Sequence, residues 1–190
     1  MKELANQSVL WKKFKRGNQS AFSVLYRHFY PSLYFFALKS MRHEQDAREC
    51  VQELFVTVWN SRQRLGDVSD VKAYLFKSLR RIIYRYASAP SNDIPLLSEN
   101  ADTMMFSPED FLIRQEEESY RHDTLAIVLN TLPVRQREAI YLKYYEGLSY
   151  PQIAEVLHIN YQSAVNLIYQ AFQALRQQPA LQQLQVPSEQ

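Results

Sequence analysis

The sequence predicts an all-α protein: two small helical domains joined by a flexible acidic linker, the second domain being a helix-turn-helix. Apolar residues recur at helical spacing over most of the chain, and no strand-type alternation of useful length appears. Turn-forming residues concentrate in one central stretch, which predicts a linker there. We therefore expect a first domain over 8–88, a linker over 89–115, a second domain over 116–178 and a tail over 179–190.

Composition argues against a disordered chain, a disulfide-linked protein and a membrane-spanning protein. Hydrophobic residues make up 46% of the 190 residues, enough for packed cores. The single cysteine, Cys50, allows no internal disulfide, which favours a reducing cytoplasm. No run of about 18 apolar residues occurs, so we expect no direct insertion into a membrane.

The residues that usually build catalytic and cofactor sites are scarce. The three glycines, Gly17, Gly66 and Gly147, lie too far apart for a phosphate-binding loop. The four histidines are scattered without metal-ligand spacing. We therefore predict that the protein is not an enzyme and has no catalytic residue, no metal and no cofactor.

Charge is strongly segregated behind a formal net charge of only +2. Residues 1–90 hold 16 Lys and Arg against 7 Asp and Glu, whereas residues 91–125 hold 2 against 9. Residues 126–190 are balanced, at 4 against 4. The pattern predicts an electropositive first domain followed by an acidic segment, and it favours a polyanionic partner for the first domain.

In the first domain, a helix over Asp46–Asn60 is expected to bury one face and expose a polar one. The next helix, Val71–Tyr86, has a second stripe beside its apolar one, at helical spacing. We call this the basic stripe; it consists of Lys77, Arg80, Arg81, Tyr84 and Arg85. Clustered cations repel one another, and nucleic acid would neutralise them with release of counterions. The alternative to nucleic-acid binding is that the stripe is an ordinary solvated basic face.

The helix-turn-helix is predicted within Leu132–Arg176. Ser149 and Gln152 fit a capping box at the start of a short helix, His158 interrupts that helix, and Asn160 is placed to cap a second helix from Tyr161. Upstream, a helix over Gln136–Tyr145 is expected to end at Gly147. Yet residues 151–174 contain no Lys or Arg, which is unusual for a DNA-binding motif.

Together these segments resemble an extracytoplasmic function (ECF) RNA polymerase sigma factor of the sigma-70 family. The resemblance rests on Asp46-Ala47-Arg48-Glu49-Cys50-Val51-Gln52-Glu53-Leu54-Phe55 with Trp59, on Ala73-Tyr74-Leu75-Phe76-Lys77, and on Leu132-Pro133 through Ile153-Ala154-Glu155. The stretch Ile159-Asn160-Tyr161-Gln162-Ser163, with Asn166-Leu167, is similar to the subgroup associated with outer-membrane nutrient uptake systems.

The resemblance implies an alternative sigma factor that directs the RNA polymerase core to specific promoters. The basic stripe would contact and help melt the −10 promoter element. A membrane-bound anti-sigma factor is implied as a further partner. The implied core-polymerase contacts are Asp46, Glu49, Gln52, Glu53 and Asn60. The implied −35 contacts in the recognition helix are Asn160, Tyr161, Gln162, Ser163, Asn166, Tyr169 and Gln170.

The chain departs from the family pattern at several of these positions. Arg81 and Arg85 replace the customary Asn and Asp of the melting helix, and His158 replaces the turn glycine. Ala164, Val165 and Gln170 occupy positions where relatives hold Val or cations. Two alternatives therefore stay open: a sigma-like protein with weakened promoter recognition that acts mainly through polymerase or anti-sigma binding, and a two-domain helix-turn-helix repressor.

Overall fold

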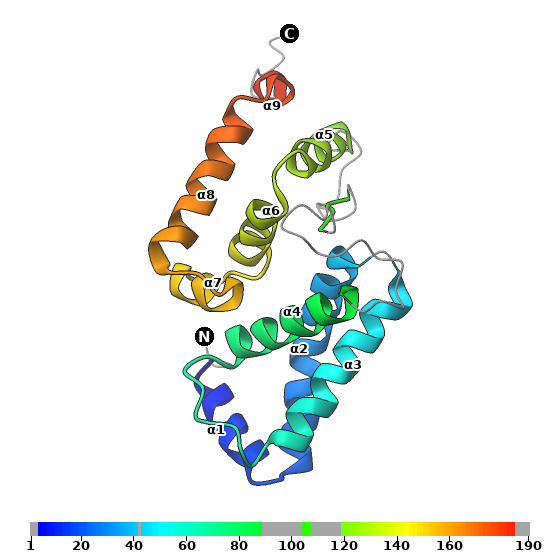
Figure 1. Ribbon diagram of the computed structural model, residues 1–190, viewed down its shortest axis with the longest axis vertical. Coiled ribbons are helices and arrows are strands. Elements are labelled where there is room, and N and C mark those ends of the chain that lie inside the picture. The colour runs from blue at the N-terminus through cyan, green and yellow to red at the C-terminus, as the bar shows by residue number, and fades with distance from the viewer. Residues whose placement is uncertain (1–3, 42, 89–103, 108–118, 185–190) are drawn as a thin grey trace.

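The computed structural model describes residues 4–41, 43–88, 104–107 and 119–184. Over these residues the chain is helical with no strand, as predicted. Figure 1 shows two helical bodies, one built from the first four helices and one from the remaining helices. The helices are α1 (Leu4–Lys15), α2 (Gln19–Ser40), α3 (Glu44–Ser61), α4 (Val71–Ala87), α5 (Ser119–Asn130), α6 (Val134–Ile140), α7 (Tyr150–Leu157), α8 (Tyr161–Arg176) and α9 (Pro179–Leu184).

The first body packs α2 against α1 and α3, and α3 in turn against α4. Its core is aromatic and aliphatic: Phe14, Leu33 and Phe36 are completely buried. Side chains that cap the starts of α2 and α4 fix where the chain turns. The Asn18 side chain accepts a 2.8 Å hydrogen bond from the Ala21 amide at the start of α2, and Asp70 accepts one of 2.7 Å from Ala73 at the start of α4.

The second body contains the predicted helix-turn-helix, formed by α7 and α8. The Gln152 side chain accepts a 2.7 Å hydrogen bond from the Ser149 amide, so the predicted capping box is present. Upstream the prediction differs in detail: the helix begins at Val134 and changes at Tyr141 into a π-helical turn, Tyr141–Tyr145. Gly147 follows with φ +66°, the left-handed conformation that ends such a helix most easily.

Two of the four described residues of the predicted linker are buried. Met104 and Phe106 are buried in the common core. The Met105 amide donates to the Lys39 carbonyl in the first body, while Phe106 exchanges two 2.9 Å hydrogen bonds with the Asn130 side chain in the second. The segment 104–107 thus bridges both bodies. Residues 89–103 and 108–115 of the predicted linker lie outside the described residues.

The two bodies meet along α4 and α7, which lie against each other (Figure 1). The hydrophobic core continues across this boundary, because the ring of Phe36 on α2 lies 5.8 Å from that of Tyr141. The predicted pair of domains is therefore packed together in this structure.

Cys50 belongs to this packing. It is 1% exposed beside Met41, and burial raises the pKa of its thiol to about 12. A thiol that stays protonated at neutral pH is a poor nucleophile.

The turn between α7 and α8 contains a strained residue. His158 has φ 56° and ψ 49°, and it is the one non-glycine residue with positive φ among those the structure describes. His158 stands where the resemblance to ECF sigma factors implies a glycine. A side chain with a Cβ pays a conformational penalty there.

We expect His158→Gly to raise the free energy of unfolding by about 0.5–1 kcal/mol, because glycine adopts this conformation without the Cβ clash. Thermal or urea unfolding measures the change. His158→Ala is the matched control, since it keeps the Cβ and should bring no gain. Equal stability of the two variants would show that the backbone here is not strained.

Candidate nucleic-acid and protein interfaces

The basic stripe of α4 divides into a covered part and an exposed part. Lys77 and Arg80 face the second body and pair with its carboxylates. Arg81 and Arg85 are exposed. The periodicity thus placed these side chains on one side of the helix, but only part of that side is open to solvent.

Arg80 makes the most buried of these contacts. Its Nε and Nη2 atoms donate to both carboxylate oxygens of Glu138 on α6, at 2.9–3.3 Å, and the two side chains are 13% and 5% exposed. Nη2 also donates to the Tyr84 hydroxyl at 2.7 Å. Burial alone would lower the pKa of the Arg80 guanidinium, but the charge of Glu138 and its hydrogen bonds outweigh it, and the pKa is raised.

Three further polar contacts join α4 and the residue before it to the second body. Lys72 Nζ lies 2.8 Å from a carboxylate oxygen of Glu146, and Lys77 Nζ lies 3.4 Å from Glu155. Gln152, at the start of α7, donates at 2.7 Å to Asp70, the residue that caps α4. We call the three charged contacts, Arg80–Glu138, Lys72–Glu146 and Lys77–Glu155, the interdomain ion pairs.

A hollow of about 510 Å³ opens along the seam between α4 and α7. It is lined by Lys77, Arg80, Arg81, Tyr84, Val156 and His158. An anion entering this hollow would meet the exposed Arg81 and the loosely paired Lys77 first.

The exposed face of α3 contains the predicted polymerase contacts. Glu49, Gln52, Glu53 and Asn60 are all exposed. Asp46 is half-buried and accepts a 2.8 Å hydrogen bond from Tyr86, which raises the pKa of that phenol to about 12. Asp46 therefore fixes α3 to α4 as well as bordering this face.

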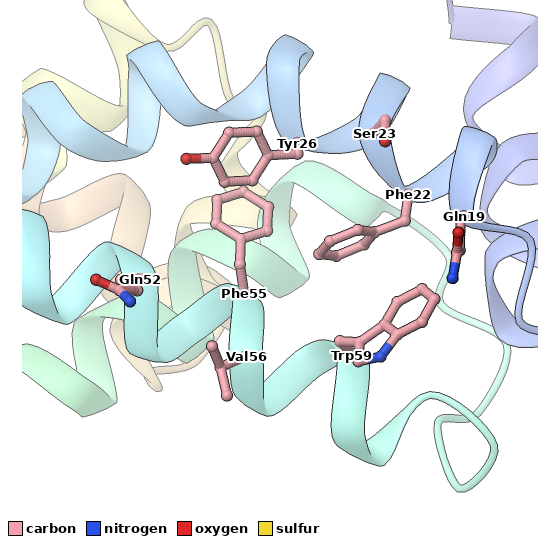
Figure 2. Close-up of a pocket in the computed structure, with 8 residues that line it drawn as sticks. All are labelled: Gln19, Phe22, Ser23, Tyr26, Gln52, Phe55, Val56 and Trp59. Atoms are coloured by element: carbon pink, nitrogen blue, oxygen red, sulfur yellow. The ribbon is translucent and has the colours of Figure 1, made fainter.

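Beside these polar residues lies an apolar groove of about 560 Å³ between α2 and α3, which we call the α2–α3 groove. Figure 2 shows the rings of Phe22, Tyr26, Phe55 and Trp59 turned toward one another across it, with Val56 and Gln52 at its α3 side. Val56 is 51% exposed and Tyr26 is 38% exposed. An exposed apolar groove bordered by polar side chains is typical of a protein-docking surface.

The two surfaces of the first body are linked by an ion pair, between Arg85 of the basic stripe and Glu53 of the α3 face. Both partners are exposed, so the pair contributes little to stability. A partner that binds Glu53 would nevertheless release Arg85 from this ion pair.

The recognition helix α8 exposes most of its predicted contacts. Tyr161 and Tyr169 are 54% and 62% exposed, and Gln162, Asn166 and Gln170 are exposed too. Ser163 is half-buried, and its amide donates at 2.7 Å to the side chain of Asn160, the N-cap of α8. Ala164 is completely buried, so a cation could not replace it without disrupting the core.

Sequence reasoning missed two groups of residues. Glu138, Glu146 and Glu155 were not predicted as contacts, although they are the three acidic residues between 126 and 178, which was a usable signal. Phe22 and Tyr26, whose helical spacing is as typical of a buried core as of an exposed groove, both line the α2–α3 groove. Their helical spacing gives the same pattern for either environment.

The described residues contain no group of three or more His, Cys, Asp or Glu side chains placed to hold a metal ion. None of the helices described here has the length and apolar character needed to cross a membrane.

Comparison with known proteins identifies the family. Residues 25–89 match the sigma-70 region 2 model, and residues 124–175 match the sigma-70 region 4 model. The chain therefore belongs to the sigma-70 family of transcription initiation factors. Its relatives place it among the ECF-type members, as an alternative sigma factor that directs RNA polymerase core to specific promoters. This decides against the helix-turn-helix repressor.

Two relatives show how fully the chain is covered. The RNA polymerase sigma-H factor of Pseudomonas aeruginosa is 24% identical, over 87% of this chain and 90% of its own length. The ECF RNA polymerase sigma-E factor of Escherichia coli K12 is 25% identical, over 92% and 95%.

Two solved structures share the fold. CnrH, in complex with the cytosolic domain of CnrY, has a TM-score of 0.63 at 23% identity, over 95% of this chain and 99% of CnrH. The sigma factor RpoE of Bartonella quintana, in complex with the anti-sigma factor NepR, has a TM-score of 0.59 at 22% identity, over 85% and 96%.

Asn160, the N-cap of α8, has a structural role that can be tested separately from any contact with DNA. Asn160→Ala should lower the free energy of unfolding by about 1 kcal/mol, because the Ser163 amide loses its acceptor. Asn160→Ser keeps a capping oxygen and should retain stability. Thermal unfolding of both variants checks this; equal losses would show that the cap hydrogen bond is not what stabilises α8.

Proposed function

We propose that three separate surfaces bind the RNA polymerase core and the two promoter elements. The exposed α3 face with the α2–α3 groove binds the RNA polymerase core. The basic stripe of α4 contacts the −10 element, and the exposed side of α8 contacts the −35 element.

The observation that carries the polymerase assignment is the adjacency of polar and apolar groups on α3. Glu49, Gln52 and Glu53 offer hydrogen-bonding groups along one exposed edge, and the groove beside them offers aromatic surface. Interfaces between proteins combine an apolar centre with such a polar rim. Neither feature is turned toward the second body, so this surface is accessible while the two bodies are packed together.

The DNA assignment rests on charge and exposure. Arg81 and Arg85 are exposed cations suited to phosphates. Tyr84, on the same helix, is half-buried, and the Arg80 guanidinium lies over its ring at 4.3 Å from the centroid. On α8, the exposed Gln162 and Asn166 have amide groups of the kind that pair with adenine in the major groove, and here Gln162 donates a 3.0 Å hydrogen bond to Asn166. The N-terminus of α8 can also hold a phosphate through its backbone amides.

A second candidate is favoured by one observation: within 151–174 the chain has no cation. An α8 without phosphate contacts binds duplex DNA weakly by itself. In this alternative the second body acts mainly through polymerase or an anti-sigma factor, and promoter recognition is correspondingly weak.

We also propose a cytoplasmic location and a membrane-bound anti-sigma partner. CnrH was solved with the cytosolic domain of CnrY, and RpoE with the anti-sigma factor NepR, which supports an equivalent complex here. The residues Ile159–Ser163 support membership of the subgroup associated with outer-membrane nutrient uptake systems.

Val56→Glu tests the polymerase surface. A charge placed at the edge of the α2–α3 groove should weaken binding to purified core polymerase at least tenfold, since it must be desolvated against apolar surface. Val9→Glu, on α1, is the matched control because that valine is similarly exposed, at 46% against 51%. Surface-immobilised core polymerase gives the affinities. Equal binding by both variants would exclude the groove from the interface.

Run-off transcription with core polymerase on the gene's own upstream region tests the DNA assignment. Arg81→Ala should reduce open-complex formation several-fold and flatten its salt dependence by about one unit, while polymerase binding stays intact. Arg64→Ala, an exposed arginine outside α4, is the control. No transcript from the wild type at low salt, despite a stable polymerase complex, would instead favour the second candidate.

A further inference from the structure

We propose that the end of α1 forms a second anion-binding site on the first body, which takes backbone phosphates of single-stranded DNA. The site, which we call the α1 corner, consists of Lys12, Lys15 and Arg16 together with Asp67 from the loop between α3 and α4. It is separate from the basic stripe of α4 and does not depend on the role proposed for that stripe.

The charge at the end of α1 is the first support. Four of the five residues from Lys12 to Arg16 are cations, and none of the five is an acid. Lys12, Lys15 and Arg16 are three and four residues apart, so they share one face of the helix. Cations at the end of a helix stabilise its dipole, but three on one face also repel one another. A polyanionic ligand would neutralise them with release of counterions.

These cations border a hollow, which is the second support. It measures about 380 Å³, and its lining of three cations against the single acid Asp67 leaves an excess of positive charge. Lys12 and Arg16 are exposed, and Lys15 is half-buried. Among the described residues that line the hollow there is no aromatic ring on which a base could stack. The hollow therefore suits phosphate groups of any sequence.

The small size of the hollow favours a single strand. Duplex DNA is stiff over about 150 base pairs, so it cannot bend into a recess of these dimensions. A single strand is flexible and can follow the surface of the loop and of α1.

Asp67 is the internal counter-ion that a phosphate would replace. Lys15 Nζ donates a 2.9 Å hydrogen bond to the Asp67 carboxylate. This hydrogen bond and the charge of Lys15, with a further contribution from the charge of Lys12, hold the pKa of Asp67 below its usual range. Both lysines thus act on the same carboxylate. Asp67 is 74% exposed, so its ion pair is weak and exchanges readily for another anion.

This exchange would release the middle of the loop that leads into α4. At the start of the loop Arg62 Nη1 donates at 2.7 Å to the Trp59 carbonyl, and at its end Asp70 caps α4. Between these two anchors the Lys15–Asp67 pair ties the loop to α1. A phosphate bound at Lys15 therefore frees Asp67 while both ends of the loop stay fixed.

The α1 corner is accessible while the two bodies are packed together, because its lining comes from the first body alone. α2 has 22 residues and is about 33 Å long. Near its C-terminal end the Lys39 carbonyl accepts from the Met105 amide of the bridging segment, so its start, next to the end of α1, lies at the far end of the first body (Figure 1). The corner can therefore attach the factor to DNA in the packed arrangement.

The experiment measures binding of a fluorescein-labelled thymidine oligonucleotide to the full-length protein, without polymerase, by anisotropy over a series of salt concentrations. Lys12→Ala and Arg16→Ala should each weaken binding several-fold and reduce the slope of log affinity against log salt by about 0.7. Lys13→Ala is the matched control, because it removes the same charge from the neighbouring exposed lysine, which does not line the hollow. It should leave the slope unchanged.

Asp67→Asn tests the counter-ion. It should tighten oligonucleotide binding several-fold, because Lys15 loses its competing carboxylate. Asp123→Asn removes the same charge from an exposed acid on α5 and should leave the affinity unchanged. Equal affinities for the two asparagine variants would show that Asp67 does not compete with phosphate at this site.

The possible failures differ. Equal effects of Lys12→Ala and Lys13→Ala, or no binding by the wild type at low salt, overturn the α1 corner. Calorimetric titration with pyrophosphate tests a free anion: saturable binding that needs Lys12, with oligonucleotide binding that does not, overturns the assignment to DNA. Arg81→Ala should weaken oligonucleotide binding additively with Lys12→Ala. If Arg81→Ala has no effect whereas Lys12→Ala does, the proposed role of α4 fails and the α1 corner stands.

Discussion

The most buried polar contact between the two bodies is one ion pair, Arg80–Glu138, which constrains how the continuous core around it can be assembled. Its two members belong to different bodies, and each is kept from water by the other's domain. Separating a buried charge from its partner without admitting water costs about 3–5 kcal/mol. Partly opened, dry intermediates are therefore disfavoured, and the two bodies are either fully docked or far enough apart for both charges to be hydrated.

Local signals in the sequence predicted most of the fold because they act within one helical turn. The caps at Ser149 and Asn160 and the left-handed residue His158 all lie where the sequence indicated. The bonding partner of the basic stripe could not be predicted in the same way. Helical periodicity places Lys77 and Arg80 on one face, but only the tertiary packing decides whether water, nucleic acid or protein satisfies that face.

Glu138 illustrates the same limit from the other side. It lies in the charged run Arg135-Gln136-Arg137-Glu138, which resembles an ordinary solvated surface, yet Arg137 is completely buried and Glu138 is 4% exposed. The α2–α3 groove shows the opposite case, because aromatic residues with core-like spacing line an open surface there. In both cases residue type suggests one environment and the tertiary structure imposes another.

The short segment 104–107 adds a kinetic consequence. Because it is bonded to Lys39 on one side and Asn130 on the other, the chain between the bodies is pinned near its middle. A pinned connection keeps the effective concentration of one body near the other high. Docking of one body on the other within a single chain is a first-order event, whose rate does not depend on how many copies of the factor a cell holds. Capture by a separate anti-sigma protein is second-order and slows as either protein becomes scarce.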